Sequence, residues 1–289
     1  MRHNIQAYGA EDLRGEATLL TSYHVHSIFS DGSDTIREIV RAAAEAGLDE
    51  IGVSDHYVFL PDGRAVDWSM PLDALPRYIE EIRAASDEFR DRVTVRYGVE
   101  ADYLPETADA LAQTIAAHPF DYVIGSVHFV DGFPIDESPE FWQALSEAER
   151  NDIIRAYWAR IARMADSGLF DFAGHLDLYK KFGHLPTVDM SADIAAALDA
   201  IARSGMAAEL NTAGWFKPDI MEAYPSPAIV RECFARGIPM LVTADAHTAS
   251  GLTTAYDRGR RALIEAGYTV TPVFEKRRMK MTPIQAPEI

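Results

Sequence analysis

The stretch LLTSYHVHSIFSDGSDTIREIVRAAAEAGLDEIGVSDH, residues 19–56, decides the fold. It opens and closes with short β-type runs at 19–25 and 50–54, and helical spacing lies between them. Thr35 and Glu38 have the spacing of a capping box, and Gly47 supplies a stop after the helix. The apolar positions of this segment fall on one helix face: Ile36, Ile39, Val40, Ala43 and Ala44. The stretch therefore predicts a strand, a helix and a second strand.

The same alternation continues along the rest of the chain. Further β-type runs lie at 94–100, 122–128, 171–175, 207–211 and 240–245, and helical spacing recurs at 75–89, 153–164, 194–201 and 256–266. Right-handed crossovers between consecutive parallel strands close such a series into a barrel or leave a doubly wound open sheet. We therefore expect an α/β protein with seven strands.

Every predicted strand ends in a side chain that can coordinate a cation or form a hydrogen bond. These strand-end residues are His24 and His26, Asp55 and His56, Glu100, His128, His175, Asn211, and Asp245 with His247. In a parallel barrel all such ends open on one face, where enzymes of this architecture keep their active sites. The pattern therefore favours a closed barrel with a metal site at the C-terminal ends of the strands.

Six of the nine histidines stand at these strand ends. Burying so many imidazoles beside carboxylates costs free energy unless the side chains bind cations or pair fully. A donor set of nitrogen and oxygen without sulfur suits Zn, Mn or Fe. The other three histidines, His3, His118 and His184, lie in a polar terminus, at a helix end and in a loop, and we do not expect them to be ligands.

Composition limits the kind of protein and its partners. The 289 residues fit one domain, 19–289, preceded by an N-terminal extension, 1–18. A formal charge of −18 disfavours long nucleic acid and anionic membranes as partners. The single cysteine, Cys233, leaves no internal disulfide, and no apolar run is long enough to span a membrane. We therefore expect a cytoplasmic protein, and its oligomeric state stays open.

The motifs at the strand ends resemble those of a known family. They are His24-Val25-His26 with Ser30-Asp31-Gly32, Ser54-Asp55-His56, Gly98-Val99-Glu100, Gly125-Ser126-Val127-His128, Gly174-His175-Leu176-Asp177 and Asp245-Ala246-His247. Together they resemble the PHP superfamily of metal-dependent phosphoesterases, most closely its histidinol-phosphatase branch. The resemblance runs from about residue 21 to residue 268.

The resemblance implies a distorted (β/α)7 barrel that holds two to three divalent ions. The implied ligand sets share Glu100 between the first two ions: His24, His26, Glu100 and Asp245; then Glu100, His128 and His175; then Asp31, His56 and His247. Residues 30–34 also read as a turn before the first helix, so a turn role is the alternative for Asp31. Two features depart from the compact family pattern, namely the N-terminal extension and the loop 57–70.

The resemblance also implies the hydrolysis of L-histidinol phosphate to L-histidinol and phosphate, a late step of histidine biosynthesis. Two ions would activate a bridging hydroxide for attack on phosphorus, with Glu100 between them and Asp245 or His247 managing a proton. The predicted substrate contacts are Lys180 and Lys217 for the phosphate, with Asn211 and Asp177 orienting substrate or ligands. The alternatives are another small phosphate ester or nucleotide as substrate, and a non-catalytic metal-binding domain.

Overall fold

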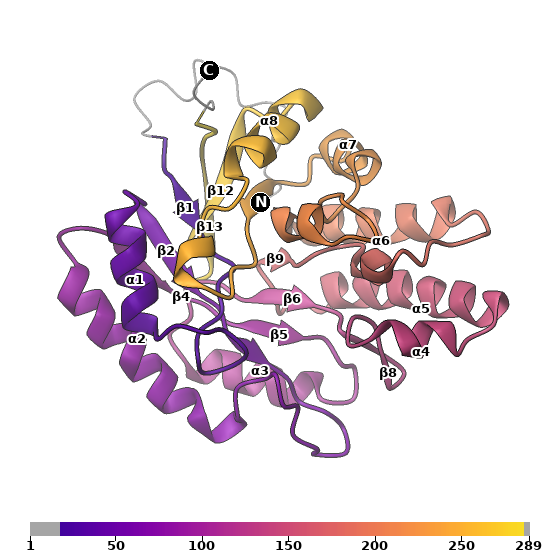
Figure 1. Cartoon of the computed structure of the whole chain (residues 1–289), viewed down its shortest axis with the longest axis horizontal. Coiled ribbons are helices and arrows are strands. Elements are labelled where there is room, and N and C mark those ends of the chain that lie inside the picture. The colour runs from indigo at the N-terminus through magenta and orange to yellow at the C-terminus, as the bar shows by residue number, and fades with distance from the viewer. Residues whose placement is uncertain (1–17, 286–289) are drawn as a thin grey trace.

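Two parallel sheets form the centre of the molecule. The computed structural model describes residues 18–285, and the N-terminal extension predicted at 1–18 lies outside them except for its last residue. The first sheet has the order β1-β2-β4, with β1 (Thr21–Ser22), β2 (Glu50–Val53) and β4 (Thr94–Tyr97). The second has the order β11-β10-β9-β6-β5-β3, and its strands are β3 (His56–Tyr57), β5 (Glu100–Asp102), β6 (Ile124–Ser126), β9 (Phe172–Ala173), β10 (Ala207–Asn211) and β11 (Met240–Thr243) (Figure 1).

The described strands do not form a single closed sheet. The two sheets continue into each other through the chain, because β2 leads into β3 and β4 leads into β5. The Tyr78 hydroxyl lies at this break, where it accepts the Asp55 amide at 3.3 Å and donates to the Gly98 carbonyl at 2.9 Å. On the other side an isolated parallel bridge joins Val25 to Ala246, so that the segment after β1 lies beside the segment after β11. The strand alternation is confirmed as a parallel α/β fold.

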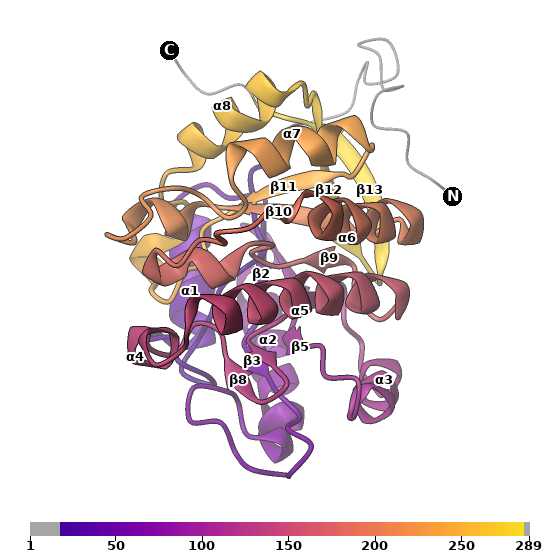
Figure 2. The ribbon, with the colours of Figure 1, turned by 90° about the vertical axis from the view of Figure 1, so that its right-hand side faces the viewer.

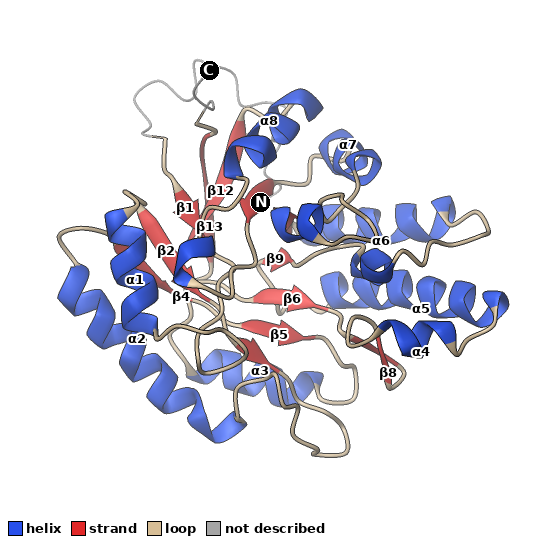
Figure 3. Cartoon of the chain, in the orientation of Figure 1, coloured by secondary structure: helices blue, strands red, loops and turns tan. Residues whose placement is uncertain are grey.

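Helices lie around the strands, as Figure 3 shows in blue. They are α1 (Ile36–Glu45), α2 (Leu75–Phe89), α3 (Ala108–Ala117), α4 (Pro139–Gln143), α5 (Glu147–Asp166), α6 (Ser191–Ser204), α7 (Pro227–Ala235) and α8 (Tyr256–Ala266). The capping box at the start of α1 is confirmed: the Thr35 side chain accepts the Glu38 amide, and the Thr35 amide donates to the Glu38 carboxylate at 2.9 Å. None of the helices within residues 18–285 is both long and apolar enough to cross a membrane.

Two short antiparallel hairpins complete the fold. One consists of β7 (Phe129–Val130) and β8 (Phe133–Pro134), and the other of β12 (Val270–Glu275) and β13 (Arg278–Pro283). Figure 2 shows β12 and β13 beside the sheets, and the Thr271 hydroxyl of β12 donates to the Met240 carbonyl of β11 at 3.1 Å. The Phe274 ring of β12 packs on Tyr23, Tyr122 and Phe172, with centroid distances of 5.9, 6.2 and 5.4 Å. Because Tyr122 lies just before β6 and Phe172 begins β9, this hairpin covers the end of the sheets away from the histidines.

Candidate metal centre

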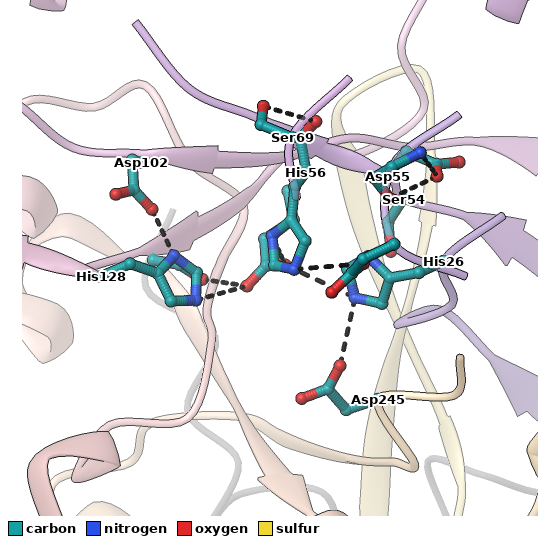
Figure 4. Close-up of polar contacts among 12 residues, drawn as sticks. His26, Ser54, Asp55, His56, Ser69, Asp102, His128 and Asp245 are labelled. Carbon is teal, nitrogen blue, oxygen red and sulfur yellow. Dashed lines mark hydrogen bonds and ion pairs between the residues drawn. The ribbon is translucent and has the colours of Figure 1, made fainter. Parts of the chain in front are cut away.

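The side chains at the strand ends converge on one place. Four overlapping groups each bring one nitrogen or oxygen atom per residue within 4.8 Å of the others. The groups are His26, Asp31, His56 and His247; His24, Glu100 and His175; His24, His26 and Asp245; and His56, Glu100 and His128. Figure 4 shows His26, His56 and His128 pointing toward one another from β3 and from the segments that follow β1 and β6. All nine residues that the sequence predicts as ligands therefore lie together.

Glu100 lies at the centre of this arrangement. Its carboxylate is buried at the start of β5, and Oε2 lies 2.8 Å from His56 Nδ1 and 3.2 Å from His24 Nε2. The other oxygen, Oε1, lies 3.0 Å from His175 Nε2 and accepts the Ser126 hydroxyl at 2.5 Å. Imidazoles therefore face both oxygens of the carboxylate, which is the arrangement expected of a bridging carboxylate.

Two further carboxylates of the group lie in loops. Asp245 follows β11 with a left-handed backbone (φ 50°), and its Oδ1 lies 3.1 Å from His26 Nε2 and 3.5 Å from His24 Nε2. Asp31 Oδ2 lies 3.1 Å from His247 Nε2, and Oδ1 lies 3.8 Å from His56 Nε2. The neighbouring Asp34 accepts the Ala249 amide at 2.7 Å. Asp31 therefore faces the imidazoles while lying within a turn.

The electrostatics of the group favour added positive charge. Burial lowers the pKa of His24, but the carboxylates of Glu209, Asp245 and Glu100 outweigh it and raise that pKa well above its ordinary value. Burial opposes ionisation of Glu100, yet the facing His56 and His24 rings hold its pKa well below the usual range. Three ionised acids around buried imidazoles attract a cation, either protons or a metal.

Unpartnered atoms indicate that the group suits metal ions. Among the described residues, His24 Nε2, His26 Nδ1, His56 Nδ1, His175 Nδ1 and Glu100 Oε2 are buried and make no hydrogen bond. A buried polar atom without a partner costs about 1–3 kcal/mol. Burial, followed by the neighbouring His56 and His247 rings, lowers the pKa of His26 to about 3, which keeps its ring neutral and able to coordinate. The residues present therefore fit divalent cations.

Two buried acids that the sequence did not single out support the imidazoles from behind. Asp102 Oδ1 lies 2.5 Å from His128 Nδ1, and Glu209 Oε2 lies 2.8 Å from His24 Nδ1. Asp102 lies two residues after Glu100 and Glu209 two before Asn211, and residues two apart share one face of a strand. That period of two was the available signal, although it cannot name the histidine that each acid meets.

An open cavity of about 400 Å³ lies over the imidazole and carboxylate groups. The residues that line it are Asp31, His56, Trp68, His128, Asp136, Glu137, His175, Leu178, Lys181, Ala213, Lys217, Tyr224, Asp245 and His247. Trp68 comes from the loop 57–70, and its ring meets His56 and His128 edge to face at centroid distances of 4.8 and 5.2 Å. This loop therefore forms one wall of the cavity.

The predicted substrate residues divide between the cavity and the interior. Lys217 lines the cavity, whereas Lys180 and Asp177 form a buried ion pair at 2.9 Å and are not among its lining residues. Lys180 Nζ also reaches Glu222 at 2.7 Å and the Ala223 carbonyl at 2.8 Å. The structure therefore places Lys180 and Asp177 in the interior rather than against the cavity, because Asp177 and Glu222 already pair with the Lys180 ammonium there.

Asn211 and Lys181 both donate to acids at or beside the group. Asn211 is fully buried, and its amide donates to Glu209 Oε1 at 3.0 Å and to Asp245 Oδ2 at 3.2 Å, so it orients an acid of the group. Lys181 lines the cavity, but its ammonium donates to the Asp136 carboxylate at 2.9 Å and to the Asp136 carbonyl at 2.7 Å. Lys217 is thus the cavity lysine without a matching acid in the described part of the chain.

Fold and site together define a parallel α/β protein with a histidine and carboxylate centre, able to bind metals, at the C-terminal ends of its strands. The PHP domain model matches residues 22–213, and the chain belongs to the PHP family. A Deinococcus radiodurans relative named "Probable histidinol-phosphatase" is 40% identical over 265 residues, which are 91% of this chain and 99% of the relative. The Bacillus subtilis "Histidinol-phosphatase" is 28% identical over 259 residues, 81% of this chain and 96% of that protein.

Solved structures agree on the fold. The histidinol phosphate phosphatase of Lactococcus lactis, described in complex with zinc, L-histidinol and phosphate, superposes with a TM-score of 0.78 and 24% identity, covering 91% of this chain and all of the other. A Listeria monocytogenes protein described as "putative histidinol phosphatase" gives a TM-score of 0.74 at 23% identity, covering 82% of this chain and 99% of the other. The predicted PHP membership is therefore confirmed by the domain model and the Deinococcus radiodurans relative, and the solved structures confirm the fold.

Proposed function

We propose that this protein is a metal-dependent phosphomonoesterase that hydrolyses L-histidinol phosphate to L-histidinol and phosphate. The observation that carries the proposal is the convergence of six imidazoles and three carboxylates beneath one cavity. Membership of the PHP family and relatives named histidinol-phosphatase over nearly their whole length support the choice of reaction. The ligands described for the Lactococcus lactis structure support the choice of substrate.

We propose that the nine converging residues hold two to three divalent ions, zinc, manganese or iron. The buried nitrogen and oxygen atoms without hydrogen bonds support this assignment. The ligands would be His24, His26, Asp31, His56, Glu100, His128, His175, Asp245 and His247. When bound, such ions would supply Lewis-acid activation of water and of the phosphoryl group.

The chain's own side chains would bind the substrate and move its protons. Lys217 would attract the phosphate electrostatically, since its ammonium lines the cavity. His247 is the most open of the six imidazoles, with 39% of its side chain exposed, and Asp245 lies beside it. We propose that one of these two delivers a proton to the leaving alkoxide oxygen. Trp68 would exclude water from the side of the cavity that His56 and His128 form.

We also infer that the nine parallel segments make up a distorted (β/α)7 barrel within a single domain. Counting β2 with β3 and β4 with β5 as interrupted strands leaves seven in the order of the chain. The His26 amide donates to the Ala246 carbonyl at 2.9 Å, and the Ala246 amide donates to the His24 carbonyl at 3.0 Å. These two bonds link the first strand segment to the last and support closure.

The test is phosphate release by the purified protein after reconstitution with zinc, manganese or iron. We expect turnover of L-histidinol phosphate, and we expect its loss in a His128→Ala variant that still folds. If the wild-type protein cleaves other phosphomonoesters efficiently but not L-histidinol phosphate, the proposed substrate is contradicted and the assignment as a phosphomonoesterase is not. Absence of phosphatase activity with every metal would contradict both.

A further inference from the structure

Glu209, which is not among the predicted ligands, contacts several residues of the centre. It lies in β10 and is fully buried. Its Oε1 accepts the His175 amide at 2.7 Å and the Asn211 amide group at 3.0 Å. Its Oε2 accepts the Thr243 hydroxyl at 2.8 Å and lies 2.8 Å from His24 Nδ1. Four donors from four segments therefore meet on one carboxylate.

These contacts determine which nitrogen of His24 carries hydrogen. An ionised carboxylate only accepts, so the His24 Nδ1 that faces it must be the N–H donor. In the neutral ring the lone pair is then on Nε2. Nε2 is buried, makes no hydrogen bond, and lies 3.2 Å from Glu100 Oε2 and 3.5 Å from Asp245 Oδ1. Its lone pair thus points into the proposed metal centre.

We infer that Glu209 is a positioning residue that fixes His24 in its Nδ1–H form and so keeps Nε2 available as a metal ligand. The inference rests on the proposed metal-dependent function, since it assigns a role toward the metal. Acids behind metal-bound histidines typically set the ring orientation, and their loss weakens metal affinity by roughly 10–100-fold.

Replacement of Glu209 by glutamine gives a sharp consequence. A glutamine has one accepting oxygen and one donating NH2, so it cannot serve four donors. The His175 backbone N–H cannot become an acceptor, so the glutamine oxygen must stay on that side and its NH2 must face His24 and Thr243. The Thr243 hydroxyl can rotate to accept. His24 can accept only by moving its hydrogen to Nε2, which removes the ligand lone pair.

The experiment compares zinc binding by wild type, Glu209→Gln and Asp171→Asn. Asp171 is the matched control, because it is another largely buried acid that accepts a backbone amide, from Val123 at 2.7 Å, but pairs with Arg277 rather than an imidazole. Zinc content, chelator competition and unfolding by urea are measured on all three proteins. The ¹⁵N imidazole spectrum of the zinc-loaded proteins reports directly on the His24 nitrogens.

We expect Glu209→Gln to lose roughly 10–100-fold in zinc affinity, with the His24 Nδ1–H signal absent, while Asp171→Asn keeps its zinc. Wild-type zinc affinity in Glu209→Gln would overturn the inference. Equal zinc loss in both variants would also overturn it, because a general loss of packing would then explain the effect. Wild type that binds zinc but does not hydrolyse L-histidinol phosphate would contradict the proposed substrate and leave this inference standing on its binding data.

Discussion

Replacing Lys180 by methionine separates structural from substrate-binding lysines. Lys180 is 3% exposed, and its ammonium contacts Asp177 at 2.9 Å, Glu222 at 2.7 Å and the Ala223 carbonyl at 2.8 Å. Methionine keeps most of the side-chain volume but leaves Asp177, which is 2% exposed, as an unmatched buried charge. Removing one partner of a buried ion pair costs about 3–5 kcal/mol. We expect Lys180→Met to lose that much free energy of unfolding.

The loss should depend on pH in a defined direction. Burial raises the pKa of Asp177 above its ordinary value, although Lys180 acts to lower it, and removing Lys180 must raise that pKa further. A carboxyl whose pKa is raised by folding binds more protons in the native state than in the unfolded state. The destabilisation that it causes therefore grows as pH rises. The difference between Lys180→Met and wild type should therefore be smaller near about pH 5 than near about pH 8.

The assay is urea unfolding at both pH values, together with steady-state phosphate release. Lys180→Met should keep a KM close to that of wild type, because Lys180 does not line the cavity. A variant as stable as wild type with a KM raised tenfold or more would refute the assignment of Lys180 to the interior. A destabilisation that grows as pH falls would refute the role given to Asp177.

Three further predictions concern the cavity, the base of the sheets and the metals. Lys217→Met should raise KM for a phosphate ester with little change in urea midpoint, since one attractive charge leaves the cavity wall; an unchanged KM would contradict this role. Phe274→Ala should lower the free energy of unfolding by about 3–5 kcal/mol, because the ring is 1% exposed against three aromatic rings; a loss below about 1 kcal/mol would indicate that the hairpin is dispensable. Removal of metal by a chelator should lower Tm, because only the folded chain brings the ligands together and bound metal therefore stabilises the folded state. A Tm that neither chelator nor added zinc changes would argue against a metal centre.

The position of the site was predictable because it depends on periodicity. Residues at the ends of parallel strands meet on one face whatever the loops do, so His24, Glu100 and Asp245 were brought together by strand order alone. The partners of Glu209 and Asp102 were not predictable in the same way. Which acid stands behind which imidazole depends on the register between neighbouring strands, and that register comes from packing in three dimensions.

Three features were not predicted from the sequence, namely the inward direction of Lys180, the hairpin of β12 and β13, and the helix α3. Lys180 follows a strand end closely, but the 3₁₀ turn at Leu178–Phe182 turns its side chain inward, and sequence spacing carries no information on that direction. The hairpin of β12 and β13 was not predicted because its turn residues, Lys276 and Arg277, adopt φ values of 50° and 61° without the glycine or asparagine typical of such turns. The helix α3 buries only Leu111 fully, so it lacked a clear apolar face.

The central claim is that nine side chains from separate strands and loops hold divalent ions beneath one cavity. Anomalous X-ray scattering at the zinc absorption edge, recorded from crystals of zinc-loaded protein, locates such ions without reference to activity. We predict anomalous peaks among His24, His26, Glu100 and the residues grouped with them. Zinc found elsewhere on the molecule, with none between these side chains, would contradict the account.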